Sequence, residues 1–211
     1  MVAALTLPVL IANYQKNVLK GQFKKTYSVL SQSLNNVVSE YGSVPECYYN
    51  LSSSGTITGT AMVVECKIAR DIILNNINVI KICENQSYAN GCIPKYNGFD
   101  DIKKENNPDM SDDEIEASMD GIVGFSRNHI LNINPSYVLA DGTIIVSYVE
   151  TFPLLFAVDI NGKKGPNKWG YDLFAFKVAQ DVNKAYLVGP TNYPVEKGGM
   201  TTQEMLEEMN K

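Results

Sequence analysis

Hydrophobic residues follow a two-part pattern at the start of the chain. An uncharged apolar run extends from Val2 to Ala12. Beyond it, apolar residues recur mostly at steps of three and four, which is the spacing of one helical face. The pattern predicts one continuous helix over Val9 to Tyr41, about 50 Å long at 1.5 Å per residue, that ends before Gly42. The apolar stripe consists of Tyr14, Val18, Phe23, Tyr27, Leu30, Leu34, Val37 and Tyr41.

The apolar run is too short to act alone in a membrane. Its eleven residues are fewer than the roughly 20 that span a bilayer, and it lacks the basic segment and cleavage motif of a signal peptide. We expect it to be the last part of a longer apolar helix that begins upstream of Met1. Pro8 would cost about 3 kcal/mol inside an ordinary helix, whereas neighbouring helices in a membrane or filament core can satisfy the freed backbone group. Pro8 therefore favours a helix that is surrounded by other helices, as in the core of a filament, over an ordinary surface helix.

The rest of the chain predicts both helices and strands. A second, shorter helix is expected over Thr60 to Leu74, and an extended segment from Asn75 to Cys83. Two apolar segments between Tyr137 and Val149 surround an Asp141-Gly142 step, which is a strong hairpin signal. The segments FPLLFAVDI and YDLFAFKV form a second expected pair of strands, joined by a loop over Asn161 to Gly170.

Four strands at such close spacing favour an antiparallel sheet. A long helix needs a partner that covers its apolar stripe, and this sheet is the available one. The sequence therefore predicts an α+β fold in which a long N-terminal helix packs on an antiparallel β-sheet. Residues 1–41 form the helix, with 1–12 as the remnant of the apolar segment, and residues 42–211 form the head of the same domain.

Two capping boxes predict short surface helices. Ser111 and Glu114 form the first, and Thr201 and Glu204 form the second, which opens a helix that reaches Met209. The acidic run around the first box is typical of a solvated face. Its members are Asp109, Asp112, Asp113, Glu114 and Glu116.

Net charge and cysteine spacing argue against several classes of function. The net charge of -5 argues against a nucleic-acid binder. The four cysteines form no C-x-x-C pair, so disulfides in an oxidising compartment are expected rather than a zinc or thioredoxin site. Cys83 and Cys92 flank a turn and can form a local bridge. Cys47 and Cys66 would then remain, and the sequence leaves their connectivity open.

Three segments resemble one bacterial family. AALTLPVLIANYQKNVLKGQFKKTYSVLSQSL, residues 3–34, is similar to the stretch that follows the prepilin cleavage segment of type IV pilin-like proteins and type II secretion pseudopilins, with Pro8 at the position of a family proline. DINGKKGPNKWGYDLFAF, residues 159–176, resembles their closing loop and strand. KIC followed by GC, residues 81–92, resembles their cysteine-bounded loop. The family's leader, cleavage site, phenylalanine and glutamate are missing, and we expect them upstream of Met1.

The resemblance implies a structural subunit of a pilus or of a type II secretion filament. Its upstream helix would anchor it in the inner membrane with the head in the periplasm, and would pack in the core of the filament, which in a pilus lies at the cell surface. Its partners would be other pilin-like subunits and the membrane, and no nucleic acid. The alternative is an exported or membrane-tethered binding or adhesin module. The residues of the assembly helix would be Leu7, Pro8, Leu10, Ile11, Tyr14 and Val18.

A glycine-rich segment offers oxygen ligands of the kind that calcium prefers. The spacing is not that of an EF-hand, because Lys163 occupies a ligand position and Gly170 stands where the bidentate glutamate belongs. The alternative is a tight structural loop whose side chains hydrogen-bond the local backbone. Pseudopilins carry calcium near this end of the chain, so the resemblance implies Ca²⁺ as a cofactor. The candidate ligands are Asp159, Asn161, Asn167 and Asp172.

The sequence gives little sign of catalysis. No G-x-S-x-G, P-loop or H-E-x-x-H string is present. The sole histidine, His129, has no cysteine or clustered carboxylates near it in the sequence and is interpreted as structural. We therefore expect no enzyme and no catalytic residue.

Overall fold

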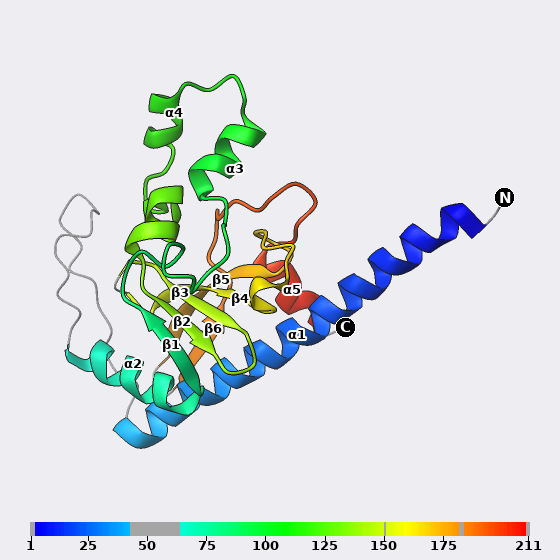
Figure 1. Cartoon of the computed structure of the whole chain (residues 1–211). Helices are drawn as coiled ribbons and strands as arrows, with labels where there is room; N and C mark the ends of the chain where they lie inside the picture. Colours follow the sequence, from blue (N-terminus) through cyan, green and yellow to red (C-terminus); the bar gives the residue numbers. More distant parts are fainter. Residues whose placement is uncertain (1–2, 43–63, 150, 182–183, 210–211) are drawn as a thin grey trace.

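The chain builds three layers around one sheet (Figure 1). The computed structural model describes residues 3–42, 64–149, 151–181 and 184–209, and for residues 3–16, 64–65 and 180–181 it describes the backbone alone. In the described part, six antiparallel strands follow one another in chain order across the sheet. Helices α1, α2 and α5 pack on one face, and short helices from the middle of the chain cover the other.

Helix α1 (Ala3–Tyr41) confirms the predicted long helix and begins earlier than Val9. Its stripe is buried against the sheet as expected: Leu30, Leu34 and Val37 belong to the core, and Tyr27 packs on it. The helix ends at Gly42, whose positive φ and bond from its N–H to the Val38 carbonyl are typical of a helix C-terminus. Among the described residues, no helix is both long and apolar enough to cross a membrane.

The two predicted hairpins are present. The Asp141-Gly142 step joins β2 to β3, with Tyr137 opposite Ile145, and the second hairpin pairs β4 with β5, with Asp159 opposite Leu173. The sheet is wider than the four predicted strands. Strand β1, which confirms the C-terminal part of the predicted extended segment from Asn75 to Cys83, pairs with β2, and β6 pairs with β5. The strands are β1 (Val79–Cys83), β2 (Ser136–Leu139), β3 (Ile144–Ser147), β4 (Leu155–Asp159), β5 (Leu173–Asp181) and β6 (Lys184–Val188).

The second predicted helix is shifted toward the C-terminus. Helix α2 spans Val64–Asn76, so Asn75 and Asn76 are helical rather than extended. Residues 60–63 of the prediction lie outside the described residues. Ala69, Ile73 and Ile77 pack against α1 and the sheet in one core.

The second face of the sheet carries its own core. Alternate strand residues such as Ile144, Val146 and Ala175 face away from α1 and meet Phe99, Phe125 and other side chains of the chain between β1 and β2. The elements of this layer are α3 (Phe99–Asn106), α4 (Asp112–Ala117), the 3₁₀ turn η1 (Val123–Phe125) and the π-helical turn η2 (His129–Ile133).

Both predicted capping boxes form. The Ser111 N–H donates to the Glu114 carboxylate at 2.7 Å, and the Glu114 N–H donates back to the Ser111 hydroxyl at 3.3 Å, which starts α4. Thr201 and Glu204 repeat this exchange at the start of α5 (Thr202–Met209). The acidic run around α4 is exposed, as expected of a solvated face.

One predicted disulfide is present. Cys83 and Cys92 are bonded and close a loop of sequence separation 9. Cys66 is also disulfide-bonded, whereas Cys47 lies outside the described residues. The Cys83–Cys92 bridge ties the end of β1 to the second core, because both sulfurs are buried there.

Removal of this bridge by the double substitution Cys83→Ala and Cys92→Ala is expected to lower the free energy of unfolding by about 2 to 3 kcal/mol, since the open loop gains entropy in the unfolded chain. Denaturant unfolding of the two proteins measures the difference. Alkylation of both cysteines in the native protein without reductant would contradict the bridge itself.

Candidate functional site

The candidate calcium ligands lie in the loop between β4 and β5. Asp159 is the last residue of β4, and Asp172 immediately precedes β5, so the hairpin brings the two carboxylates together. Both side chains are fully buried. The loop between them contains a 3₁₀ turn, η3 (Gly162–Lys164), and a cis peptide bond between Gly165 and Pro166.

Backbone N–H groups hold the two carboxylates. Asp172 accepts from the N–H groups of Asn167 and Lys168, both at 2.7 Å. Asp159 accepts from the Asn161 N–H at 3.1 Å and from the Tyr96 hydroxyl at 2.9 Å. These contacts confirm the structural role that the sequence suggested for Asp159. A structural loop would have the Asn167 side chain hydrogen-bond the local backbone as well, but its side-chain oxygen accepts no hydrogen bond from the described residues. The Asp172 carboxylate accepts the backbone hydrogen bonds at that end of the loop instead.

Gly162 is required where the loop meets the neighbouring hairpin. Its φ is +63°, and a Cβ at this position would lie 2.0 Å from the Gly142 carbonyl oxygen. A side chain at Gly162 would therefore push the two hairpin loops apart.

Burial makes the charged form of both carboxylates unfavourable, and the charge of Asp172 adds to this cost at Asp159. Burial, and then the charge of Asp172, raise the pKa of Asp159 to about 7. Burial also raises the pKa of Asp172, although the backbone N–H groups of Lys168 and Asn167 oppose the rise. Burial next to Asp159 raises the pKa of the Tyr96 hydroxyl well above its usual value. A bound cation would relieve this cost, because it favours both charged carboxylates.

Two buried oxygens in the same loop lack a hydrogen-bond donor. They are Asn161 Oδ1 and Asn167 Oδ1, and neither has a partner among the described residues. The Asn161 amide group donates to the Gly165 carbonyl at 2.8 Å and also lies beside Asp172, whose pKa it lowers. Two carboxylates and two amide oxygens in one loop fit a hard cation such as Ca²⁺, which takes six to eight oxygen ligands. In the described part of the chain, no group of three or more His, Cys, Asp or Glu side chains forms a metal cluster, so the carbonyl and amide oxygens would carry much of the coordination.

The raised pKa of Asp159 gives a pH dependence with a definite sign. Without a cation, the folded state binds more protons than the unfolded state between about pH 4 and pH 7, so stability should fall as pH rises through that window. The fall is on the order of 4 kcal/mol, at about 1.4 kcal/mol for each pKa unit. Thermal unfolding in a chelator, from pH 4 to pH 8, measures it.

Added Ca²⁺ should raise the melting temperature at pH 7.5 and flatten this pH dependence. Asp159→Asn should remove most of the pH dependence together with the calcium response, leaving the smaller part that comes from the raised pKa of Asp172. Asp109→Asn, at an exposed position of the acidic run, should change neither. A melting temperature that does not respond to Ca²⁺ at pH 7.5 would leave the loop with its structural role alone.

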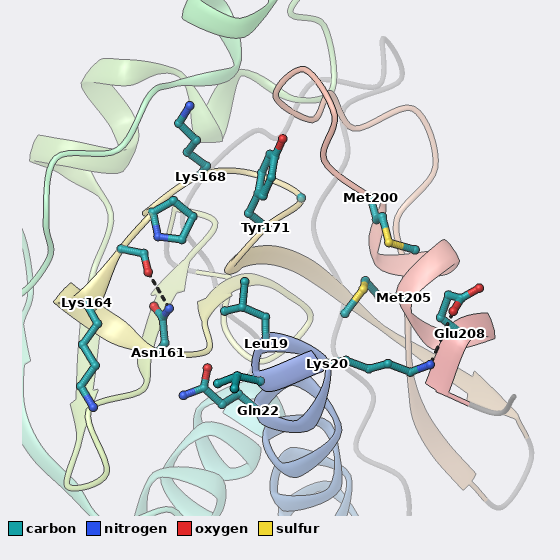
Figure 2. A pocket seen from close by; sticks show the side chains of 14 residues that line it. Leu19, Lys20, Gln22, Asn161, Lys164, Lys168, Tyr171, Met200, Met205 and Glu208 are labelled. Atoms are coloured by element: carbon teal, nitrogen blue, oxygen red, sulfur yellow. Dashed lines mark hydrogen bonds and ion pairs between the residues drawn. The ribbon is translucent and has the colours of Figure 1, made fainter. Parts of the chain in front are cut away.

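An apolar cavity opens beside this loop, where α1 leaves the head (Figure 2). We call it the α1 groove. Its volume is about 860 Å³. One wall is α1, the second is the loop after β4, and the third is the end of the chain around α5. The lining residues are Val18, Leu19, Lys20, Gln22, Asn161, Lys164, Gly165, Pro166, Lys168, Gly170, Tyr171, Met200, Met205 and Glu208.

Val18 is the assembly-helix residue whose side chain the structure describes. It is 41% exposed and lines the α1 groove. Leu7, Pro8, Leu10, Ile11 and Tyr14 lie in α1, but their side chains are outside the described residues.

His129 makes a local contact. Its Nδ1 lies 2.8 Å from the Ser126 hydroxyl, three residues earlier in the chain, and burial lowers its pKa. The contact joins two side chains three residues apart, which is a local structural role of the kind that the sequence suggested.

Sequence reasoning missed two buried polar residues near the loop. Tyr96 binds Asp159 from 63 positions away. Glu196 is 5% exposed, donates its N–H to the Trp169 carbonyl at 3.1 Å, and pairs with Lys168 at 3.6 Å. The contacts of Glu196 hold the C-terminal segment against the loop, and the Tyr96 hydroxyl ties the loop to the second layer. The sequence carries no local signal for either, because both pair across long sequence separations.

Comparisons with family models, with curated proteins and with solved structures gave no match.

Proposed function

We propose that this chain is a structural subunit, a pilin or pseudopilin, of a bacterial type IV pilus or type II secretion filament. The observation that carries the proposal is that α1 has two parts, one packed on the head and one that extends beyond it. From Phe23 onward the helix is anchored in the core of the head, whereas its N-terminal turns run clear of the head as a straight extension (Figure 1).

The division of α1 matches the two-part pattern of its sequence. The anchored part carries the apolar stripe, and the extension carries residues Ala3 to Ala12 of the uncharged run. An uncharged helix that leaves its own domain needs lipid or other helices around it. Pro8 is tolerated best in that setting, since neighbouring helices can satisfy the backbone group that it frees.

In this account the chain works mechanically. An upstream continuation of the helix holds the subunit in the inner membrane with its head in the periplasm, and then packs in the filament core while the head faces outward. The chain is acidic, with a net charge of -5, which suits contacts with protein rather than with nucleic acid. Ca²⁺ in the β4–β5 loop would stabilise the head, and no reaction is involved.

Expression of the gene with its own upstream codons, in a cell that contains a prepilin peptidase, tests the proposal. The processed protein should fractionate with the inner membrane and form crosslinks to other pilin-like subunits. A processed protein that stays soluble in the periplasm, without such crosslinks, would favour the exported binding module instead. Residues 1–211 alone are expected to form a monomer or a weak oligomer and no filament, because the core of a filament needs the whole apolar helix.

A further inference from the structure

The α1 groove lies at the base of the helical extension. Val18 and Leu19 of α1 form its inner wall, and in Figure 2 Leu19 points into the same space as Met205. Tyr171 and Pro166 from the loop, together with Met200, complete a largely apolar lining. The volume of about 860 Å³ lies near the upper end of the range for ligand pockets.

The charges around the groove do not select a charged occupant. Lys20 and Glu208 face each other across one rim at 3.5 Å and neutralise one another. Lys168 is engaged with Glu196, and the ammonium groups of Lys164 and Lys168 point away from the centre of the groove (Figure 2). An uncharged, apolar occupant therefore matches the lining best.

The chain itself carries a segment of that chemistry, the run from Val2 to Ala12. It cannot reach its own groove. Helix α1 is continuous from Ala3 to Tyr41, so the run is carried away from the groove along the helix axis, and its nearest residue, Ala12, is already about 9 Å beyond Val18 at 1.5 Å per residue. A second copy of the chain has no such restriction.

We propose that the α1 groove receives the apolar helical run, Ala3 to Ala12, of a second copy of this chain. The contact is heterologous, because the groove of one copy meets the extension of the next. A heterologous contact that does not close into a ring repeats along an open helical filament. The inference deepens the proposed function, on which it rests for its biological role, by naming the surface of the head that recognises the neighbouring subunit.

The test uses the full 211-residue chain and engineered cysteines. Protein with Leu7→Cys is mixed with protein with Lys164→Cys, an exposed position on the groove rim, and a short bis-maleimide reagent captures neighbours while the native disulfides stay intact. Mass spectrometry should identify the Leu7–Lys164 heterodimer in severalfold excess over the product of Leu7→Cys with Val123→Cys. Val123 is 48% exposed and belongs to the layer on the opposite face of the sheet. A yield equal to that control would overturn the docking site.

A matched pair of substitutions distinguishes docking in the α1 groove from association through other parts of α1. Val18→Asp, in the groove wall, should reduce the heterodimer to the control yield, and Val29→Asp should leave it unchanged, because Val29 is similarly exposed on the same helix and lies outside the groove lining. Equal loss in both variants would show that helices associate elsewhere, and would also overturn the proposal.

The outcome is independent of the filament test. Crosslinks without filaments from the complete gene would support the docking site and refute the filament role. Filaments without these crosslinks would support the filament role and refute the docking site.

Discussion

Replacement of Phe23 by alanine is expected to lower the free energy of unfolding by about 3 to 5 kcal/mol. Phe23 is fully buried where α1 crosses the sheet. Its ring centroid lies 4.9 Å from that of Phe174, edge to face, and 5.7 Å from that of Phe176. The substitution removes these contacts and leaves a cavity between two rigid elements that cannot close around it.

Val29→Ala is the control, on the same helix and facing solvent. With 38% of Val29 exposed, the change should stay within about 0.5 kcal/mol. Urea unfolding of both variants with disulfides intact gives the comparison. Similar values for the two variants would mean that α1 is not held by its apolar stripe, and the division of the helix into an anchored and an extended part would lose its basis.

The long helix could be predicted because its signal is local and repeated. Phe23, Leu30, Leu34 and Val37 return to one face over several turns, and each is buried as that pattern requires. The hairpin at Asp141-Gly142 was equally clear, since a turn dipeptide between two apolar runs specifies both strands and their register.

Of the two edge strands, β1 lies within the segment from Asn75 to Cys83 that was predicted to be extended, whereas β6 was not predicted. Ile80 and Ile82 of β1 are 64% and 49% exposed, and Lys184 and Tyr186 of β6 are exposed as well. The residues of β1 show a weak period of two. Strand β6 does alternate between exposed and buried residues, but it has five residues, and so short a pattern is a weak signal in a sequence.

The second core could not be predicted from pattern. Phe99, Phe125 and Trp169 meet at ring-centroid distances of 4.4 to 5.5 Å, although they come from a short polar helix, a 3₁₀ turn and a loop. No helix or strand period connects them, because the packing is between segments far apart in the chain.

The candidate cation loop was predicted only as a set of residue types. Spacing placed Asp159 and Asp172 at the two ends of one loop, and the hairpin does bring them together. The sequence could not show that both would be fully buried, or that Tyr96 would occupy one oxygen of Asp159, because these facts depend on the second layer of the fold.

A charge in the helical extension should abolish assembly. Leu10 lies in the uncharged run, which in this account is surrounded by lipid and then by neighbouring helices, where an aspartate costs roughly 3 kcal/mol. Every subunit carries the substitution, so the cost recurs at each addition to the filament. Asn17→Asp is the control, because Asn17 is on the same helix and exposed.

The most direct measurement is electron microscopy of sheared or periplasmic filaments, with antibody labelling of this chain, from cells that express the complete gene with a prepilin peptidase. We expect labelled filaments from the native protein and from Asn17→Asp, and none from Leu10→Asp at equal protein levels. Native protein that is processed yet never enters a filament, or filaments that tolerate Leu10→Asp as well as Asn17→Asp, would contradict the account.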